Sequence, residues 1–322
     1  MAHRRLPKCI YRITTNRVSV SRGPEPLRIT VIAAGVVGKA TGTGLESKGH
    51  EVIFYDNDKA RLTQIASEGH RTASSIKEAV GQSEVSMICA PTPNANGTVD
   101  LEVLLSICSE LGSALQQSDS YHLIVIRSTV PPGTTREIVV PRIEATAGAP
   151  TGLRFGVCHN PEFLREKFAS EDFLHPRAIV IGEMDERAGS TLQSIYSSFG
   201  SPVFRCDPET SEMTKYASNL FNVTKISFFN EIDKVCKALG VRSEKVSKLM
   251  PLLALGLRDD LQEWGIYGGR AFGGMCLPKD LDAFIAFAQN QEIRVPLLEA
   301  VKQVNQAMSK EDQKIEVLVT NG

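Results

Sequence analysis

The sequence lacks the features that would place the protein in a membrane or on a nucleic acid. No apolar stretch approaches the roughly 18 residues that a membrane-spanning helix needs. No long basic run with interleaved aromatic residues is present, and the formal net charge is only -1. Such a balance of charges argues against a nucleic-acid partner. No internal repeat or low-complexity tract is evident either. We therefore expect a globular protein that binds neither a membrane nor nucleic acid.

The cysteines are not arranged to bind a metal or to form a redox pair. No two of them form a C-x-x-C pair, and none has metal-ligand spacing, because they are scattered as Cys9, Cys89, Cys108, Cys158, Cys206, Cys236 and Cys276. This usage is typical of a reducing compartment. The sequence therefore predicts a cytoplasmic protein without a metal.

Residues 1–27 differ in composition from the rest of the chain. They contain six arginines and lysines against a single acid, Glu25, and they end in Gly-Pro-Glu-Pro. Because they lack the apolar core of a secretory signal, we expect a disordered extension or a mis-assigned start, with a transit peptide as the alternative. The whole chain, with 42% hydrophobic residues among 322, is long enough for one large domain and a smaller one.

A glycine-containing turn follows the first predicted strand, Arg28–Ile32. The turn is Ala33-Ala34-Gly35-Val36-Val37-Gly38, and a helix of small residues and a second strand ending in Asp56 come after it. This order of strand, turn, helix and acid is the Rossmann fingerprint of dinucleotide binding. We expect Asp56 to accept hydrogen bonds from the ribose hydroxyls and to favour NAD over NADP, although Arg61 lies close by. The first glycine of the fingerprint is replaced by Ala33, which we expect to weaken cofactor binding modestly.

Strand and helix patterns then alternate as far as about residue 207. Strands are predicted at 85–90, 121–126, 154–158, 177–181 and 203–204, with helices at 101–115 and 185–199. This alternation predicts an α/β fold with a doubly wound parallel sheet, whose ligands lie at the carboxyl ends of the strands. Three loops are expected at those ends, at 91–100, 128–135 and 160–166. We assign residues 28–207 to this NAD-binding domain.

From residue 208 the pattern becomes helical, and we assign 208–322 to a second domain. One helix should run from Pro208 to about Leu239-Gly240, which is long for a globular domain. Lys215 and Asn219 lie four residues apart on it and therefore share a face. Without further information Lys215 would be interpreted as a solvated surface charge. Helices are also expected near 241–255 and 295–308.

Cys276 lies in the segment Gly273-Gly274-Met275-Cys276-Leu277-Pro278-Lys279-Asp280, directly before a helical pattern. Proline is favoured in the first turn of a helix, so Pro278 indicates that a helix begins near Cys276. The thiol should therefore lie beside the positive end of a helix dipole. At pH 7 a cysteine of pKa about 8.5 is roughly 3% thiolate, and a decrease of about one unit raises this to roughly a quarter. Cys276 is therefore a candidate nucleophile, with a small buried hydrophobe as the alternative.

The segment Gly-Gly-x-Cys-Leu-Pro-Lys-Asp resembles the active-site signature of the UDP-glucose/GDP-mannose dehydrogenases, and the similarity extends over roughly Arg28 to Met308. Those enzymes oxidise a sugar primary alcohol to a carboxylate with two NAD⁺. The resemblance implies that Cys276 attacks the aldehyde, that Lys215 and Asn219 stabilise the oxyanion, that Asp280 and Thr129 hold water, and that Glu162 is the base for thioester hydrolysis. For NAD it implies contacts from Gly35, Gly38, Asp56, Thr92, Ser128, Glu166 and Lys279. It also implies a homodimer formed through the long helix.

Two departures from the family pattern leave the substrate open. The stretch 257–272 differs from the family's substrate loop, and the chain stops at Gly322 where family members continue with a further nucleotide-binding domain. We expect a four-electron alcohol dehydrogenase acting on a nucleotide-linked sugar, or on a related nucleoside or sugar. One alternative is a single-step hydroxyacid dehydrogenase of the 6-phosphogluconate type. Another is a non-catalytic NAD-binding remnant.

Overall fold

The structure is a computed structural model, and it describes residues 26–95, 98–116, 118, 120–253, 270–274 and 276–320. Residues 1–25 of the predicted extension and most of the stretch 257–272 lie outside these ranges. The chain divides into two compact units. The first holds the residues up to Thr92 together with Leu101–Lys215, and the second holds Pro93–Asp100 and the residues from Tyr216 onward.

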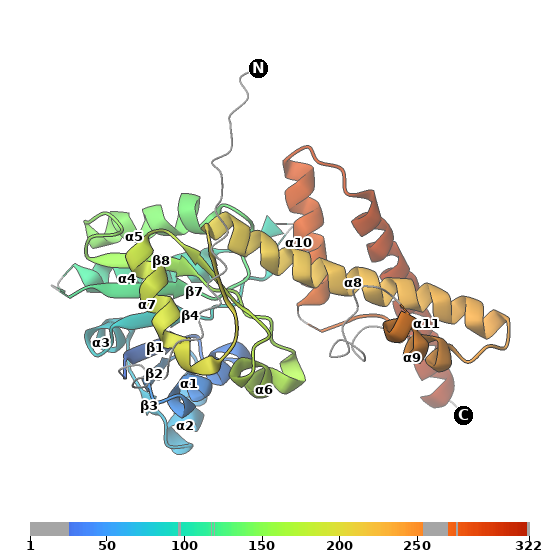
Figure 1. Ribbon diagram of the computed structural model, residues 1–322, viewed down its shortest axis with the longest axis horizontal. Helices are drawn as coiled ribbons and strands as arrows, with labels where there is room; N and C mark the ends of the chain where they lie inside the picture. The colour runs from blue at the N-terminus through green and yellow to red at the C-terminus, as the bar shows by residue number, and fades with distance from the viewer. Residues whose placement is uncertain are drawn as a thin grey trace. The chain divides into compact units, whose positions relative to one another are not determined.

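An eight-stranded sheet with the order β10-β9-β8-β7-β4-β1-β2-β3 forms the first unit (Figure 1). Its strands are β1 (Arg28–Ile32), β2 (Glu51–Tyr55), β3 (Arg71–Thr72), β4 (Val85–Ile88), β7 (His122–Ile126), β8 (Phe155–His159), β9 (Ile179–Glu183) and β10 (Val203–Cys206). Strand β1 pairs in parallel with β2 on one side and with β4 on the other. The strand order therefore reverses beside β1, which is where ligands bind in open sheets of this kind.

Helices cover both faces of the sheet because side chains of opposite parity point to opposite faces of each strand. In β7, Val125 packs into one core cluster while Ile124 and Ile126 pack into the other. The first cluster includes residues of α1 (Val36–Ser47), α2 (Lys59–Ser67), α6 (Ala169–Leu174) and α7 (Glu186–Ile195), and the 3-10 turn η3 (Ser197–Phe199) follows α7. The second includes residues of α3 (Ile76–Gly81), α4 (Glu102–Leu115) and α5 (Val140–Ala147), and the π-helical turn η1 (Thr135–Val139) leads into α5. The predicted doubly wound fold is confirmed.

The sheet is mostly parallel, as predicted, but β9 pairs antiparallel with β8. The connection between these strands contains only the short turn η2 (Glu166–Phe168) and the six-residue helix α6. Six helical residues span about 9 Å, whereas a five-residue strand spans about 16 Å. Helix α6 alone is therefore too short to carry the chain back along the length of β8, and β9 starts at the end of the sheet where β8 stops.

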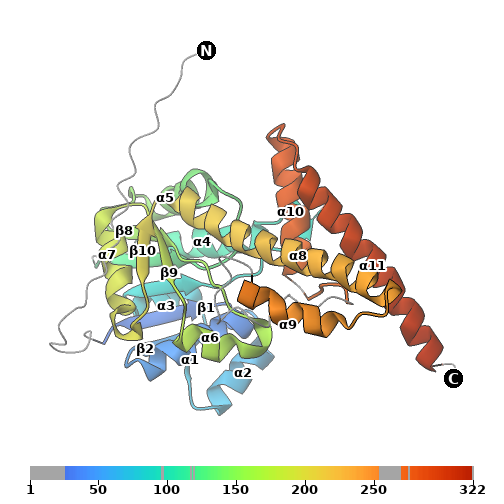
Figure 2. The same ribbon diagram turned by 45° about the vertical axis from the view of Figure 1, so that its right-hand side comes forward.

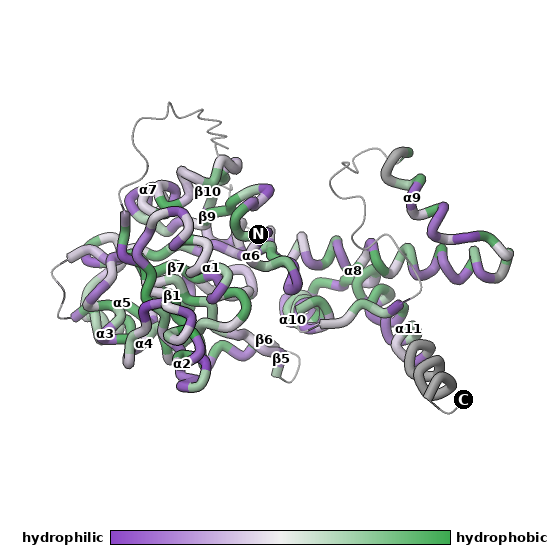
Figure 3. The backbone as a smooth tube through the Cα atoms, turned by 90° about the horizontal axis from the view of Figure 1, so that it is seen from below, coloured by the Kyte–Doolittle hydropathy of each residue, from purple (hydrophilic) through white to green (hydrophobic). Residues whose placement is uncertain are grey.

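Four helices and a small hairpin supply the described part of the second unit. Helix α8 (Pro208–Ala238) begins in the first unit and ends close to its predicted end. The other helices are α9 (Ser243–Leu253), α10 (Leu277–Asn290) and α11 (Pro296–Thr320), and the hairpin consists of β5 (Asn94–Ala95) and β6 (Thr98–Val99). Helix α10 packs against α11 (Figure 2), and the core around Tyr216, Leu220 and Leu281 joins α8 to α10. Figure 3 shows hydrophobic and hydrophilic residues alternating along α8. Among the described residues, no helix has both the length and the apolar character needed to cross a membrane.

Candidate active site

The turn between β1 and α1 has the geometry that a bound diphosphate requires. Ala33 adopts the left-handed conformation, with φ of 67°, and its N–H donates to the carbonyl of Tyr55 at 2.9 Å. A Cβ added to Gly38 would overlap the carbonyl oxygen of Ala33, so α1 can approach β1 only through a glycine. A Cβ added to Gly35 would meet no atom within 4 Å, and no side chain caps the N-terminus of α1 there. Open space next to uncapped backbone N–H groups fits the diphosphate of a dinucleotide.

Asp56 lies at the end of β2, as predicted, and its carboxylate is already engaged within the turn. One oxygen accepts hydrogen bonds from the Ala34 N–H at 2.8 Å and from Arg61 at 2.9 Å, and the other accepts from the Asp58 N–H at 2.9 Å. The side chain of Asp56 is 2% exposed and that of Arg61 is 43% exposed. The hydrogen bond and the negative charge of Asp56 raise the pKa of the Arg61 guanidinium. Arg61 is therefore the more accessible partner of this pair.

Two residues predicted to contact the cofactor line the same hollow on the first unit. Val36 at the start of α1 and Glu166 at the start of η2 both border an open hollow of about 680 Å³. Lys39 of α1 and Phe168 of η2 also line it. The structure thus brings together two predicted residues that are 130 positions apart in the sequence.

The loops after β4 and β7 are joined by hydrogen bonds at the carboxyl edge of the sheet. The Thr92 hydroxyl donates to the carbonyl of Thr129, and the Ser128 hydroxyl donates to the carbonyl of Ala90, each at 2.7 Å. His159, at the end of β8, lies 2.8 Å from the Ser211 hydroxyl, and burial lowers its pKa to about 3. The imidazole is therefore neutral and links β8 to the first turn of α8.

Glu162 and Lys215 form an ion pair within the first unit. The Lys215 ammonium donates to the Glu162 carboxylate at 2.9 Å and to the Glu162 carbonyl at 2.6 Å, and the Leu164 N–H donates to the second carboxylate oxygen at 2.6 Å. The side chains of Lys215 and Glu162 are only 5% and 11% exposed. Burial alone would raise the pKa of Glu162, but the charge of Lys215, the Leu164 N–H and the charge of Arg127 together lower it. Glu162 is therefore ionised at neutral pH, and Lys215 is not a solvated surface charge.

In the second unit, Cys276 and Asp280 lie in the first turn of α10. Cys276 is the exposed N-cap residue, and its carbonyl accepts the Asp280 N–H at 2.8 Å. The Asp280 side chain is 1% exposed, and its two oxygens accept from Asn219 at 2.6 Å and from Lys279 at 2.5 Å. The structure thus places Asn219, Lys279 and Asp280 together, one helical turn from the thiol. The alternative of a buried Cys276 is wrong.

Sequence reasoning missed two buried charged residues near the predicted ones. Arg127, directly after β7, is 4% exposed, and Glu212 of α8 is fully buried. Glu212 accepts the N–H groups of Gly133 and Thr135 at 2.6 and 2.8 Å, and burial raises its pKa to about 7 despite these hydrogen bonds. One sequence signal was present for Arg127, because this charged residue directly follows the apolar run Leu123–Ile126.

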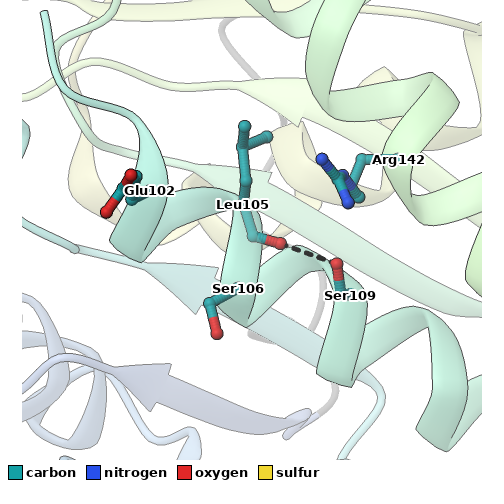
Figure 4. A pocket seen from close by; sticks show the side chains of 5 residues that line it. All are labelled: Glu102, Leu105, Ser106, Ser109 and Arg142. Atoms are coloured by element: carbon teal, nitrogen blue, oxygen red, sulfur yellow. Dashed lines mark hydrogen bonds between the residues drawn. The ribbon is translucent and has the colours of Figure 1, made fainter.

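A second, smaller depression lies on the surface of the first unit (Figure 4). Glu102, Leu105, Ser106 and Ser109 of α4 line it with Arg142 of α5, and none of the predicted site residues is among them. Within the described parts of the chain, no group of three or more His, Cys, Asp or Glu side chains is arranged to hold a metal ion.

Comparison with known proteins matches both parts of the chain to one family. Residues 64–200 match the NAD-binding domain of the UDP-glucose/GDP-mannose dehydrogenase family, and residues 209–307 match its central domain. GDP-mannose 6-dehydrogenase of Pseudomonas putida is 36% identical over 302 residues, which cover 87% of this chain and 68% of that protein. UDP-glucose 6-dehydrogenase of Haloferax volcanii is 32% identical over 87% of this chain and 69% of that protein.

Solved structures give the same result. A UDP-glucose dehydrogenase from Pyrobaculum islandicum superposes with a TM-score of 0.81 at 35% identity, covering 91% of this chain and 71% of that one. GDP-mannose dehydrogenase from Pseudomonas aeruginosa superposes with a TM-score of 0.69 at 34% identity, covering 92% and 71%.

The glycine turn, the doubly wound sheet and these matches define an NAD-dependent oxidoreductase with a Rossmann domain. Within that class, the chain belongs to the UDP-glucose/GDP-mannose dehydrogenase family, the nucleotide-sugar 6-dehydrogenases.

Proposed function

We propose that the protein oxidises the primary alcohol of a nucleotide-linked sugar to a carboxylate in two steps, with Cys276 as the nucleophile. The observation that carries the proposal is the exposed thiol at the N-terminus of α10, one turn from the buried Asp280 carboxylate and its two donors, Asn219 and Lys279. The overall reaction converts one alcohol, two NAD⁺ and one water into one carboxylate, two NADH and three protons.

The chain's own residues would hold NAD along the carboxyl edge of the sheet. Gly35 and Gly38 give the diphosphate its room. Asp56, which fixes the turn and pairs with Arg61, would accept hydrogen bonds from the adenosine ribose hydroxyls. Thr92 and Ser128 are held in place by their hydrogen bonds, and Val36 and Glu166 share one hollow. When bound, NAD⁺ accepts the hydride removed at each oxidation. We propose residues 28–207 as the NAD-binding domain and 208–322 as the domain with the nucleophile.

A nucleophile is needed because an aldehyde carbon can lose a hydride only after addition has made it tetrahedral. The Cys276 thiolate adds to the aldehyde carbon to give a thiohemiacetal, and loss of hydride from that carbon leaves a thioester on the sulfur. Lys215 and Asn219 stabilise the oxyanion, a contribution worth about 2.7–4 kcal/mol per donor in related sites.

Water then releases the acid and regenerates the thiol. Asp280 and Thr129 hold the water, and Glu162 accepts its proton as the water attacks the thioester carbon. Glu162 is ionised at neutral pH, so it is able to accept a proton when the water arrives. Thiol chemistry of this kind needs a reducing compartment, and we propose the cytoplasm.

Counting NADH tests the proposal. The protein is mixed with GDP-mannose, UDP-glucose, other nucleotide sugars and free nucleosides, and NADH is measured per mole of acid formed. We expect two NADH per acid, whereas one NADH would favour a single-step hydroxyacid dehydrogenase. Cys276→Ser should lower acid formation about 10³-fold or more. Cys206→Ser, which changes a half-buried thiol on β10, is the matched control and should keep full turnover. Full turnover in the Cys276→Ser protein would refute the proposal.

We also propose a homodimer formed through α8. Phe221, Phe228 and Val235 are seven residues apart in turn and are 58%, 50% and 57% exposed, so they line one side of the helix. A repeat of seven residues is typical of helices that pack against one another. Phe228→Glu should convert the dimer to a monomer in sedimentation experiments. Lys237→Gln, which changes an exposed residue of the same helix without adding a negative charge beside Asp233, is the control. A wild-type protein that sediments as a monomer would contradict the proposal.

A further inference from the structure

We propose that Arg127 is a positioning residue, which holds the segment from Asn160 to Glu162 in place and supplies, in addition to Lys215, a second positive charge that acts on the Glu162 carboxylate. The inference rests on the proposed function, in which Glu162 is the base for thioester hydrolysis.

The first part of the argument is the geometry of the Arg127 side chain. Its guanidinium donates to the amide oxygen of Asn160 at 2.5 Å and to the Tyr196 hydroxyl oxygen at 2.9 Å. The Tyr196 hydroxyl in turn donates to the same Asn160 oxygen at 2.6 Å, and the Asn160 amide nitrogen donates to the carbonyl of Val180 at 2.7 Å. Asn160 is 2% exposed, so both ends of its amide are fixed inside the first unit. Glu162 follows two residues later, and its backbone therefore starts from an anchored point.

The second part concerns charge. Asn160 and Tyr196 are neutral, and neutral donors would be enough to hold an amide oxygen. A buried guanidinium is costly unless an opposite charge compensates it. Burial alone would lower the pKa of Arg127, but the nearby acidic groups Tyr196, Cys89 and Glu162 together raise it. Glu162 is the only one of these three groups that is ionised at neutral pH, since burial raises the pKa of Cys89 to about 11 and also raises the pKa of Tyr196.

The groups facing Glu162 come from several elements. Lys215 on α8 forms the direct ion pair, the Leu164 N–H donates from the same loop, and Arg127 acts from the end of β7. His159 adds no charge at neutral pH, because burial lowers its pKa to about 3. Removing the charge of Arg127 should therefore raise the pKa of Glu162, because one of two cations that favour the carboxylate is lost.

The test is the dependence of thioester hydrolysis on pH in variants of residue 127. The protein is studied in single turnovers with the nucleotide sugar that it oxidises, and acid release is followed from about pH 3.5 to pH 8, because the pKa of Glu162 lies below its ordinary value. In Arg127→Met and Arg127→Gln, the acid limb should move to higher pH. At the pH of the wild-type midpoint, hydrolysis relative to the plateau at pH 8 should fall about fivefold, which corresponds to a shift of about one pH unit. Arg127→Lys keeps the charge and should keep the wild-type midpoint even if turnover decreases.

Two controls separate charge from packing. Tyr196→Phe removes a hydrogen bond to Arg127 but keeps the cation, so its midpoint should not move. Arg142→Met removes an exposed arginine of α5, which lines the depression in Figure 4, and should leave the whole profile unchanged.

Wild-type midpoints in the neutral variants would overturn the inference, and so would a displaced midpoint in Tyr196→Phe. If the neutral variants do not fold, Arg127→Lys and Tyr196→Phe decide the question, because the inference requires both to keep the wild-type midpoint. Glu162→Gln separates this inference from the proposed function. An acid limb that persists in Glu162→Gln would mean that Glu162 is not the base, whereas loss of that limb with unmoved Arg127 variants would remove only the role of Arg127.

Discussion

Alanine at Gly35 and alanine at Gly38 should damage the protein in different ways, although both glycines belong to the same turn. At Gly35, φ is −65°, which alanine adopts without strain, and a new Cβ would meet no atom within 4 Å. Such a substitution typically stabilises the fold by about 0.4–1 kcal/mol, because it restricts the unfolded chain. The methyl group would nevertheless occupy the space that the diphosphate needs. We expect NAD⁺ affinity to fall about 10- to 100-fold, or about 1.4–2.8 kcal/mol.

At Gly38 the new methyl group would meet protein instead of open space. It would overlap the carbonyl oxygen of Ala33 and would lie 3.0 Å from the carbonyl carbon of Ala33 and 3.4 Å from a methyl of Val31. Because the overlapped atom belongs to the backbone, no rotamer change can relieve the clash, and α1 must move away from β1. Overpacking of this kind costs about 1–3 kcal/mol. For a unit of about 200 residues, this lowers the melting temperature by roughly 2–12 °C.

Thermal unfolding and NAD⁺ titration, measured on the same samples, distinguish the two effects. Gly81→Ala is the control, because Gly81 ends α3 and an added Cβ would meet nothing within 4 Å there. Gly35→Ala should melt like the control but bind NAD⁺ weakly, and Gly38→Ala should melt early. The reasoning would be refuted by wild-type NAD⁺ affinity in Gly35→Ala, or by wild-type melting in Gly38→Ala.

Three further predictions concern single residues. Ala33→Gly should tighten NAD⁺ about threefold in a titration, because glycine populates the left-handed conformation of residue 33 more readily and the free turn is then better prepared for the ligand; equal or weaker affinity would contradict this. Glu212 has its pKa raised to about 7 by burial, so the folded protein binds a proton more tightly than the unfolded chain, and stability should fall as pH rises from about 4.5 to 7. Glu212→Gln should flatten the melting temperature over that window, and an unchanged slope would count against the assignment. Asn219→Ala removes a hydrogen-bond donor from the buried Asp280 carboxylate and should cost about 1–3 kcal/mol in urea unfolding, whereas a change below about 0.5 kcal/mol would show that the pair is unimportant for stability.

The sequence predicted those parts of the fold that depend on local patterns. The strand of Arg28–Ile32, the glycine turn and the acid at the end of β2 are separated by short intervals, so their order alone indicates a dinucleotide fold. The long helix was likewise predictable from an unbroken helical pattern. The reversed direction of β9 was not, because it depends on how far α6 can carry the chain, and the sequence shows only that a connection exists.

The buried charges could not be predicted for a different reason. Arg127 meets Tyr196 across 69 positions, and Glu212 meets Gly133 across 79 positions. No spacing rule connects residues so far apart, and each residue alone would be expected at the surface. Lys215 illustrates the same difficulty, since its own residue type favours a solvated charge and only the fold brings Glu162 to it.

Asp56 shows how one residue can satisfy a sequence pattern and still have a role that the pattern does not describe. Left-handed alanine costs about 1–2 kcal/mol, and Ala33 adopts that conformation. The N–H groups of residues 33 and 34 are fixed by the Tyr55 carbonyl and the Asp56 carboxylate, and a hydrogen bond to a charged group contributes about 1.5–3 kcal/mol. These two contacts are together large enough to offset the strain of Ala33. The acid at the end of β2 is therefore required to shape the turn before any cofactor arrives, which explains why a chain with alanine in place of the first glycine retains the turn.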